Sequence, residues 1–378
     1  MRYLSRPLAT AFALAVLFAG CGGGGSDDEI LIGEFGSLTG TTATFGISTR
    51  NGIDMAVDEV NARGGVLGKQ VRVIVEDDQG RPEEAQTVVT KLIASNRVIA
   101  VLGEVASSRT LAAAPVAQQY GVPLITPSST NPAVTQVGDF IFRTCFIDPF
   151  QGLVMAKFAN ETLGVTRVAV LRDIRNDYSV GLADVFVDNF KRMGGVIVSD
   201  QSYSEGDTDF RAQLTTIRAS NPQAIFVPGY YTEVGLIARQ ARELGLNVPL
   251  LGGDGWDSPA LTEIAGDALN GSYFSNHSSQ DDPSPAIQNF IAAYEKRFGA
   301  KPDALAGLGY DSAMLLFDAI ERAGTTEGPA LRDALAVTDN FPGITGQITM
   351  DANRNPIKPA VVLQVKDGGI SYVETIEP

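Results

Sequence analysis

The sequence is poor in cysteine and histidine, which limits both cross-linking and catalysis. It contains two Cys and one His in 378 residues. If Cys21 is modified, only Cys145 remains, so no intrachain disulfide can form and the hydrophobic core must supply the stability. No Cys or His spacing typical of a zinc site occurs, and we expect neither a metal nor a cofactor. We interpret His277, the only candidate catalytic base, as a solvent-exposed loop residue.

Basic clusters and long apolar segments are also missing. The formal net charge is -15 at pH 7, with Lys and Arg scattered along the chain, which argues against a nucleic-acid partner. The apolar run Leu8–Ala19 is too short for a permanent transmembrane helix. No Gly-X-Ser-X-Gly motif of a hydrolase is present. We therefore expect a soluble chain from residue 30 onward that is not an enzyme.

The first residues have the order of an export signal. Arg2 and Arg6 precede the apolar run, and Gly20 and Cys21 follow it. The residues around Cys21 resemble the lipobox of bacterial lipoproteins, which implies acylation of Cys21, although Phe18 stands where Leu is usual. An ordinary signal peptide with a chance Cys is the alternative. We predict a signal peptide at 1–20, a lipidated Cys with a Gly/Ser tether at 21–29, and a protein held by its lipid at a membrane in the periplasm or at the cell surface.

Short runs rich in β-branched residues alternate with helical patterns. In one helix, Ile53, Ala56, Val57 and Val60 fall on a single face. Such regular alternation favours parallel sheets covered by helices on both faces. The predicted strands are Ile30–Gly33, Val71–Glu76, Val98–Leu102, Val122–Thr126, Arg167–Leu171, Gly195–Ser199, Ala224–Val227 and Val248–Leu251.

The alternation restarts near Arg167, after an irregular stretch from Phe142 to Gln151. This restart indicates two α/β lobes rather than one very wide sheet. The last part of the chain differs, because Ile348–Met350 and Ala360–Val365 are predicted to be strands and Lys366–Gly369 a hairpin turn.

Polar residues of the first half follow two predicted strands. Ligands of open parallel sheets bind beyond the carboxyl ends of the strands, where helix N-termini point outward. Ser107 lies in one such loop, and Ser129 and Thr130 lie in another. Hydroxyl groups and backbone amides near a helix start suit a carboxylate.

Aromatic and acidic residues occupy the corresponding loops of the second half. Asp254 is flanked by glycines, and Tyr178 and Tyr230 follow two other strands. An acid near aromatic rings can pair with an ammonium group, so the two lobes together suit an amino acid. Helix N-capping is the alternative role for Ser107, Thr130 and Asp254, and simple packing is the alternative for the two tyrosines.

Four stretches of the chain resemble the branched-chain amino-acid-binding family of ABC importers, the type I periplasmic binding proteins. The resemblance covers nearly everything from Ile30 onward. It is most specific in Asp58–Gly65, in Thr126–Pro132, in Gly229–Tyr231 with Glu233, and in Arg239–Arg242.

Carried over by position, the resemblance implies a role for each candidate. The family commonly has Glu where this chain has Asp254, whose side chain is one methylene shorter. Phe45 and Trp256 near the pocket favour an apolar side chain. The implied carboxylate site is Ser107, the backbone of Ser129 and the hydroxyl of Thr130, and the implied ammonium site is Asp254, closed over by Tyr178 and Tyr230.

The resemblance also implies the fold and the partners. We expect two Rossmann-like lobes with parallel sheets joined by a three-crossing hinge, lobe 1 being 30–148 plus 278–352 and lobe 2 being 149–277 plus 353–378. The expected function is capture of an amino acid, branched-chain or otherwise apolar, and its delivery by a monomer to the permease subunits of an ABC importer. A sensor or receptor-type role, or an amide- or urea-like ligand, is the alternative.

Overall fold

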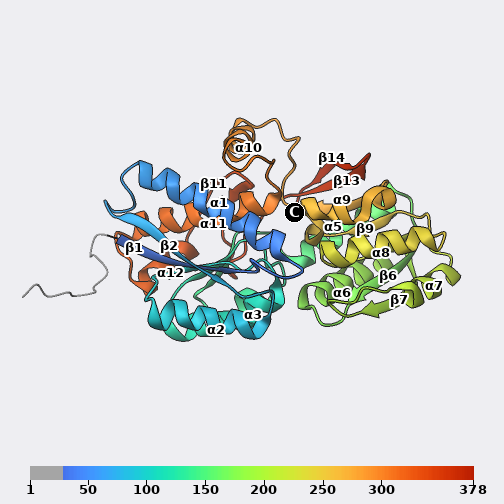
Figure 1. The fold of residues 1–378 in the computed structure, drawn as a ribbon, viewed down its shortest axis with the longest axis horizontal. Helices are drawn as coiled ribbons and strands as arrows, with labels where there is room; N and C mark the ends of the chain where they lie inside the picture. Colours follow the sequence, from blue (N-terminus) through green and yellow to red (C-terminus); the bar gives the residue numbers. More distant parts are fainter. Residues whose placement is uncertain (1–28) are drawn as a thin grey trace, which may run out of the picture.

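The computed structural model describes residues 29–378, which form two lobes placed side by side (Figure 1). The first strand starts at the outer end of one lobe, and the chain ends near the junction of the two. Within this range no helix is both long and apolar enough to cross a membrane. The predicted signal peptide, the predicted lipidation site Cys21 and nearly all of the predicted tether lie outside the described residues.

Lobe 1 is built on a five-stranded sheet in which all strand pairs are parallel. Parallel strands buried under helices are rich in Ile, Val and Leu, and Ile30, Ile32 and Leu102 are accordingly buried. In spatial order the strands are β2 (Gln70–Asp77), β1 (Glu29–Gly36), β3 (Val101–Leu102), β4 (Leu124–Thr126) and β5 (Ile141–Arg143).

Two groups of helices cover the two faces of this sheet, each with its own hydrophobic cluster. The predicted stripe Ile53, Ala56 and Val60 of α1 is buried in one cluster with α11 and α12, and α2 and α3 form the other. The bounds are α1 (Ala43–Ala62), α2 (Pro82–Thr90), η1 (Lys91–Ser95), α3 (Ser107–Tyr120), α4 (Ala133–Gln136), α11 (Ala304–Ala323) and α12 (Gly328–Ala336).

Lobe 2 has a seven-stranded sheet that is parallel except at one edge. Strands β10, β9, β8, β6 and β7 pair in parallel, while the predicted C-terminal hairpin adds β13 and β14 in antiparallel fashion. The spatial order is β14 (Gly369–Ile376), β13 (Ala360–Lys366), β10 (Ser272–Asn276), β9 (Leu250–Gly252), β8 (Ala224–Phe226), β6 (Arg167–Asp173) and β7 (Val196–Tyr203).

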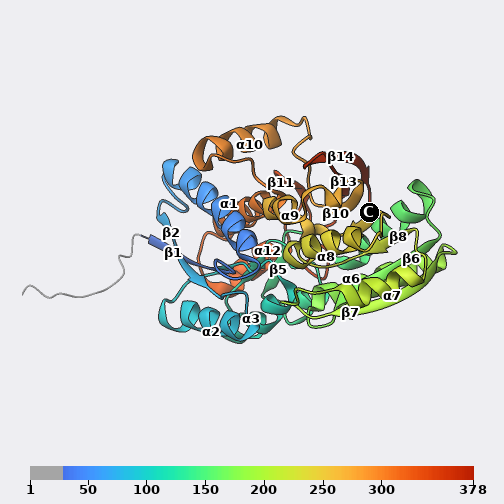
Figure 2. The same cartoon turned by 45° about the vertical axis from the view of Figure 1, so that its right-hand side comes forward.

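The helices of lobe 2 pack in two main pairs, α5 with α6 and α8 with α9. Their bounds are α5 (Asp148–Lys157), η2 (Phe158–Thr162), α6 (Asp177–Arg192), α7 (Arg211–Ala219), α8 (Tyr231–Glu243), η3 (Asp254–Trp256), α9 (Pro259–Ala265) and η4 (Gly266–Leu269). A further helix, α10 (Pro285–Phe298), stands at the top of both ribbon views and packs on α1 and α11 through Phe290 and Tyr294 (Figure 2).

The chain passes between the lobes after β5, after β10 and after the hairpin of β11 (Phe341–Gly343) and β12 (Gly346–Ile348). This agrees with the predicted two-lobed α/β fold. The residue boundaries given for the two lobes stay predictions. One strand prediction was misplaced: β12 ends at Ile348, and Met350 forms only an isolated bridge with Pro356.

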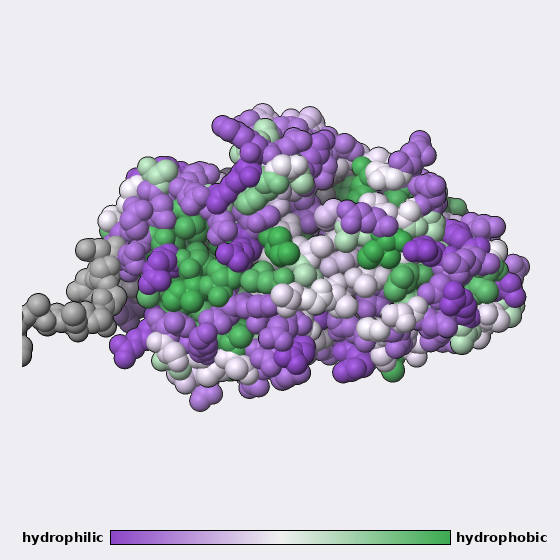
Figure 3. Space-filling model, viewed as in Figure 1, coloured by the Kyte–Doolittle hydropathy of each residue, from purple (hydrophilic) through white to green (hydrophobic). Residues whose placement is uncertain are grey.

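The surface is mostly hydrophilic, as expected for a net negative chain. Figure 3 shows one hydrophobic region in the middle of lobe 1, where β1 and β2 lie in Figure 1. Strand β2 is the edge strand of this sheet, and its residues Val73, Ile74 and Val75 are only half-buried.

Candidate functional site

A small cavity lies between the lobes, at the carboxyl ends of the strands. Four of the eight predicted site residues line it: Phe45 from α1, Tyr178 from α6, Tyr230 just before α8, and Asp254 at the start of η3. The loops that follow the parallel strands thus meet at one edge of each sheet, as the topological rule expects. The other lining residues are Val105, Ser128, Gly255 and Leu305.

The lobes are in contact around this cavity, so the arrangement is closed. Several hydrogen bonds join them, and each involves residues from the loops or helix starts beside the cavity. They run from Thr44 N to the Tyr231 hydroxyl (3.3 Å), from the Thr232 hydroxyl to Thr41 O (2.7 Å), from Asp177 N to the Ser108 hydroxyl (2.9 Å), and from the Asn131 amide to Asp177 O (2.9 Å).

Asp254 is the acid of the site and is held by three neighbours. Its backbone N–H donates to Gln151 Oε1 at 2.8 Å, and its Oδ2 lies 2.9 Å from His277 Nε2 and accepts from the Ser128 hydroxyl at 3.3 Å. The residue is 5 % exposed, and among residues 29–378 its Oδ1 has no hydrogen-bond partner. A buried carboxylate oxygen of this kind is an acceptor available to a cationic ligand.

His277 is buried, so its interpretation as a solvent-exposed loop residue was wrong. It is 4 % exposed and follows strand β10, and its ring stacks on Phe146 with centroids 3.9 Å apart. The strand was not recognised in the sequence, because Ser272–Asn276 contains two serines and an asparagine. Without the strand there was no signal that the following histidine points into the protein.

Three aromatic rings form one wall of the cavity. Tyr178 and Tyr230 stack with centroids 5.4 Å apart, and Phe45 meets Tyr230 edge-on at 5.4 Å. The Tyr178 hydroxyl accepts from Gly255 N at 3.1 Å, and burial raises the pKa of both tyrosines well above its ordinary value. A Cβ at Gly255 would lie 2.8 Å from Gly229 O and about as close to both rings, so only glycine fits there.

The residues predicted to bind a carboxylate are all buried, and none is a helix N-cap. Ser107 is the first residue of α3, whose N-cap is Ala106, and its hydroxyl accepts from Asn131 N at 3.3 Å. The Thr130 hydroxyl has no partner within the described part of the chain. Both belong to the loops that face lobe 2.

Ser129 faces away from the cavity. Its hydroxyl lies 3.0 Å from the carbonyl oxygens of Glu104 and Val105, and its N–H donates to the Thr126 hydroxyl at 2.9 Å. Its neighbour Ser128 lines the cavity instead. Sequence reasoning missed Ser128, because one residue of shift in a loop reverses the side that faces the ligand.

Trp256 also lies outside the cavity lining. Its indole N–H donates to Val227 O at 3.0 Å, and its ring packs in the core of lobe 2 near Phe274, with centroids 5.9 Å apart. It supports the turn that carries Asp254 rather than the cavity wall.

Arg109, which sequence reasoning missed, joins the lobes beside the aromatic wall. Its side chain is 3 % exposed and its Nη2 lies 2.5 Å from Glu205 Oε1 in lobe 2, while its guanidinium lies 6.0 Å from the Tyr230 ring. Burial alone would lower the pKa of Arg109, but the nearby acids Glu104 and Glu205 raise that pKa by more than burial lowers it, so the guanidinium stays charged. No signal in the sequence distinguished it from other arginines of helices.

Buried acids surround the site. Burial raises the pKa of Asp148 to about 7. Burial and the nearby Glu104 raise the pKa of Asp78 to about 8, and the Ser37 hydroxyl lies 3.2 Å from Asp78 Oδ1 and 2.7 Å from Glu104 Oε1. In the part of the chain that the structure describes, no three His, Cys, Asp or Glu residues are grouped as metal ligands would be.

Comparison with known proteins identifies relatives along nearly the whole chain. The periplasmic binding protein family matches residues 29–369. A Leu/Ile/Val-binding protein of Rhizobium johnstonii is 33% identical over 325 residues, covering 85% of this chain and 87% of the relative.

Solved structures agree with the fold and differ in their ligands. A leucine-binding protein of Thermotoga maritima is 41% identical with a TM-score of 0.88, covering 92% of this chain and 99% of the other. A branched-chain amino-acid transporter substrate-binding protein of Streptococcus pneumoniae, in complex with isoleucine, is 36% identical with a TM-score of 0.88, covering 93% and 100%. A solute-binding protein of Rhodopseudomonas palustris in complex with 3,4-dihydroxybenzoic acid is 26% identical with a TM-score of 0.84, covering 93% and 98%. The family match spans most of the chain, and the relatives include Leu/Ile/Val-binding and leucine-binding proteins. The chain therefore belongs to the periplasmic binding protein family.

Proposed function

We propose that this protein binds a branched-chain or other apolar amino acid between its lobes and delivers it to the permease subunits of an ABC importer. The observation that carries the proposal is Asp254, whose buried Oδ1 has no partner among residues 29–378 and whose side chain lines the cavity. An ammonium group would neutralise this carboxylate and donate hydrogen bonds to it. His277 and Ser128 contact only Oδ2, so a cationic donor is favoured at the free Oδ1.

The rest of the cavity suits the other two parts of an amino acid. Thr130 and Ser107 do not line the cavity, but the Thr130 hydroxyl and the N-terminus of α3 at Ser107 lie in the loops beside it, where they would hold a carboxylate once the lobes open. Phe45, Val105 and Leu305 offer apolar surface for a side chain.

An aromatic acid is the second candidate ligand, favoured by the rings of Phe45, Tyr178 and Tyr230 and by the relative that holds 3,4-dihydroxybenzoic acid. Such an acid has no ammonium group to pair with Asp254. Its carboxylate would also experience repulsion from that buried acid. The charge of Asp254 therefore favours an amino acid.

Calorimetry on ligand-stripped protein lacking residues 1–28 tests the proposal. Leucine, isoleucine and valine should bind and raise the thermal midpoint, by an amount equivalent to about 2.7 kcal/mol at a hundred times the dissociation constant. Asp254→Asn should weaken this binding by ~100-fold, since it removes the charge but keeps the size. Asp188→Asn, at an exposed position of α6, is the matched control.

Either of two results would contradict the proposal. If 3,4-dihydroxybenzoate binds and the three amino acids do not, the aromatic-acid alternative holds. If amino acids bind equally to the wild type and to Asp254→Asn, the ammonium contact is wrong. The anchor is tested separately, because Cys21→Ser should move the full chain from the membrane fraction to the soluble fraction.

A further inference from the structure

A second cavity lies where the chain crossing after β10, the helix α10 and the start of α11 meet. It is separate from the cavity that holds Asp254 and takes no part in the function proposed above. Its lining comes from both lobes, with Asp257 and Leu363 on one side and Asp303 on the other.

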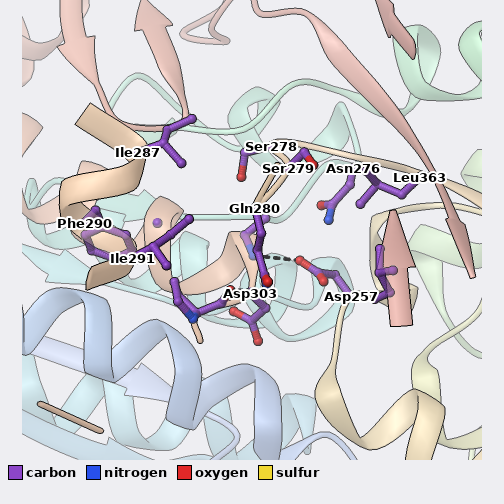
Figure 4. A pocket seen from close by; sticks show the side chains of 14 residues that line it. Asp257, Asn276, Ser278, Ser279, Gln280, Ile287, Phe290, Ile291, Asp303 and Leu363 are labelled. Atoms are coloured by element: carbon purple, nitrogen blue, oxygen red, sulfur yellow. Dashed lines mark hydrogen bonds between the residues drawn. The ribbon is translucent and has the colours of Figure 1, made fainter. Parts of the chain in front are cut away.

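One wall of this cavity is apolar. Figure 4 shows Ile287, Phe290 and Ile291 of α10 projecting from one side and Leu363 of β13 from the opposite side. Phe290 and Ile291 are both 8 % exposed, so the wall is well packed from behind. These side chains can bury a hydrocarbon group of a ligand.

Two carboxyl groups lie across from the apolar wall (Figure 4). Asp257 is 6 % exposed, and its Oδ2 accepts from Ala304 N at 2.7 Å, across the lobe junction. Asp303 is the N-cap of α11, and its Oδ1 accepts from Ala306 N at 3.0 Å and from the Ser48 hydroxyl. A carboxylate can accept about four hydrogen bonds, so both retain acceptor capacity.

The cavity has no positive charge of its own. None of the residues that line it is Lys, Arg or His. Burial first, and the neighbouring Asp257 second, raise the pKa of Asp303 to about 7. A bound cation would stabilise both carboxylates in their ionised form, whereas a bound anion would be repelled.

We propose that this second cavity binds a primary ammonium ion that carries an apolar group, with the ammonium on Asp257 and Asp303 and the hydrocarbon part on α10. An ammonium group has three donors, which matches two carboxylates in one pocket. A neutral molecule of the same shape would bring no charge to pair with the carboxylates and would not favour their ionised form.

The test uses 2-phenylethylamine and its neutral isostere 2-phenylethanol, with thermal shift and calorimetry on the wild type and three variants. The amine should bind and the alcohol should not. Asp303→Asn should weaken amine binding at least about tenfold, and because Asn caps helices as well as Asp, α11 should remain folded. Glu295→Gln, which removes an exposed acid of α10 outside the cavity, is the control.

Asp254→Asn separates this site from the first cavity, where the same amine could contact Asp254 and the tyrosines. Binding that persists in Asp254→Asn and is lost in Asp303→Asn supports the proposal. Binding that is lost in Asp254→Asn and kept in Asp303→Asn overturns it, as does equal binding of the alcohol or no binding of the amine. Ile287→Trp, which fills the cavity with a larger side chain, should also abolish binding.

Discussion

The contact between His277 and Asp254 orients the acid of the candidate site. The ring nitrogen lies 2.9 Å from a carboxylate oxygen, and stacking on Phe146 fixes the plane of the ring. His277 does not line the cavity. We interpret it as a positioning residue, which aims the free oxygen of Asp254 at the ligand.

We therefore expect His277→Phe to weaken amino-acid binding roughly tenfold, because it keeps the stacking on Phe146 but removes the hydrogen bond. His277→Gln can donate to Asp254 again and should recover most of the affinity. Calorimetry gives the two dissociation constants, and denaturant unfolding shows whether the fold is retained. If both variants weaken binding equally while their stability is unchanged, the hydrogen bond is not what positions Asp254.

Glu34 is a buried acid of β1 that makes stability depend on pH. Burial, and to a lesser extent Asp54, raise its pKa to about 8, while its Oε2 has no partner within the described chain. Between the pKa of an ordinary glutamate and pH 8, the folded protein keeps this proton and the unfolded chain releases it. The free energy of unfolding therefore falls as pH rises, by up to about 1.4 kcal/mol per pH unit for this group.

Glu34→Gln removes this titration. The variant should be more stable than the wild type at about pH 8, by roughly 3–4 kcal/mol, and should differ little at about pH 5. Urea unfolding at both pH values measures the difference. Glu83→Gln, at an exposed position, is the control. If the wild type and Glu34→Gln lose the same stability between the two pH values, Glu34 is not the group that titrates.

The candidate residues that the sequence predicted well are those fixed by the topology alone. Tyr178, Tyr230 and Asp254 follow strands of a parallel sheet, so their position at its edge needs no knowledge of side-chain direction. Ser128 and His277 could not be found this way. Which of two adjacent serines faces the cavity, and whether a histidine is buried, depend on tertiary contacts.

At the scale of elements, the close approach of α1 and α11 sets the shape of lobe 1. Gly52 of α1 lies against the backbone of α11, and a Cβ there would stand 1.9 Å from Ala306 O and 2.9 Å from Tyr310 N. Gly309 of α11 approaches Thr49 O in the same way. Small residues at both crossing points let the two helices touch.

Gly52→Ala should destabilise the protein by about 1–3 kcal/mol, because the clash with α11 outweighs the better helix propensity of alanine. Denaturant unfolding measures the loss. Arg50→Ala, on the exposed side of the same helix, should change stability by less than about 0.5 kcal/mol. A stability of Gly52→Ala equal to that of the wild type would show that the helices can separate freely.

Strand prediction succeeded where the residues are apolar and failed where they are not. Val71–Glu76 and Ala360–Val365 were found nearly in full, as β2 and β13. Strands β5 and β10 were missed because Ile141–Arg143 is short and Ser272–Asn276 is largely polar. Both are buried by neighbouring strands, a tertiary effect that overrides local propensity.

At the scale of the whole molecule, closure depends on contacts that exist only when the lobes meet. Among these contacts between the lobes, the charged one is the buried ion pair between Arg109 and Glu205, whose side chains are 3 % and 28 % exposed. In an open form Glu205 would be solvated. The pair therefore stabilises the closed form selectively, and a ligand that binds between the lobes gains from it.

Glu205→Gln should shift the equilibrium toward the open form and weaken amino-acid binding about tenfold, since apparent affinity falls with the fraction of closed molecules. Calorimetry measures the affinity, and small-angle scattering of free and ligand-saturated protein measures the closure. Glu243→Gln is the matched control, because Glu243 pairs with Arg211 within lobe 2 and both are exposed. If Glu205→Gln binds as tightly as Glu243→Gln, the ion pair does not contribute to closure, and the neutral hydrogen bonds from Thr44 and Thr232 across the junction must be sufficient.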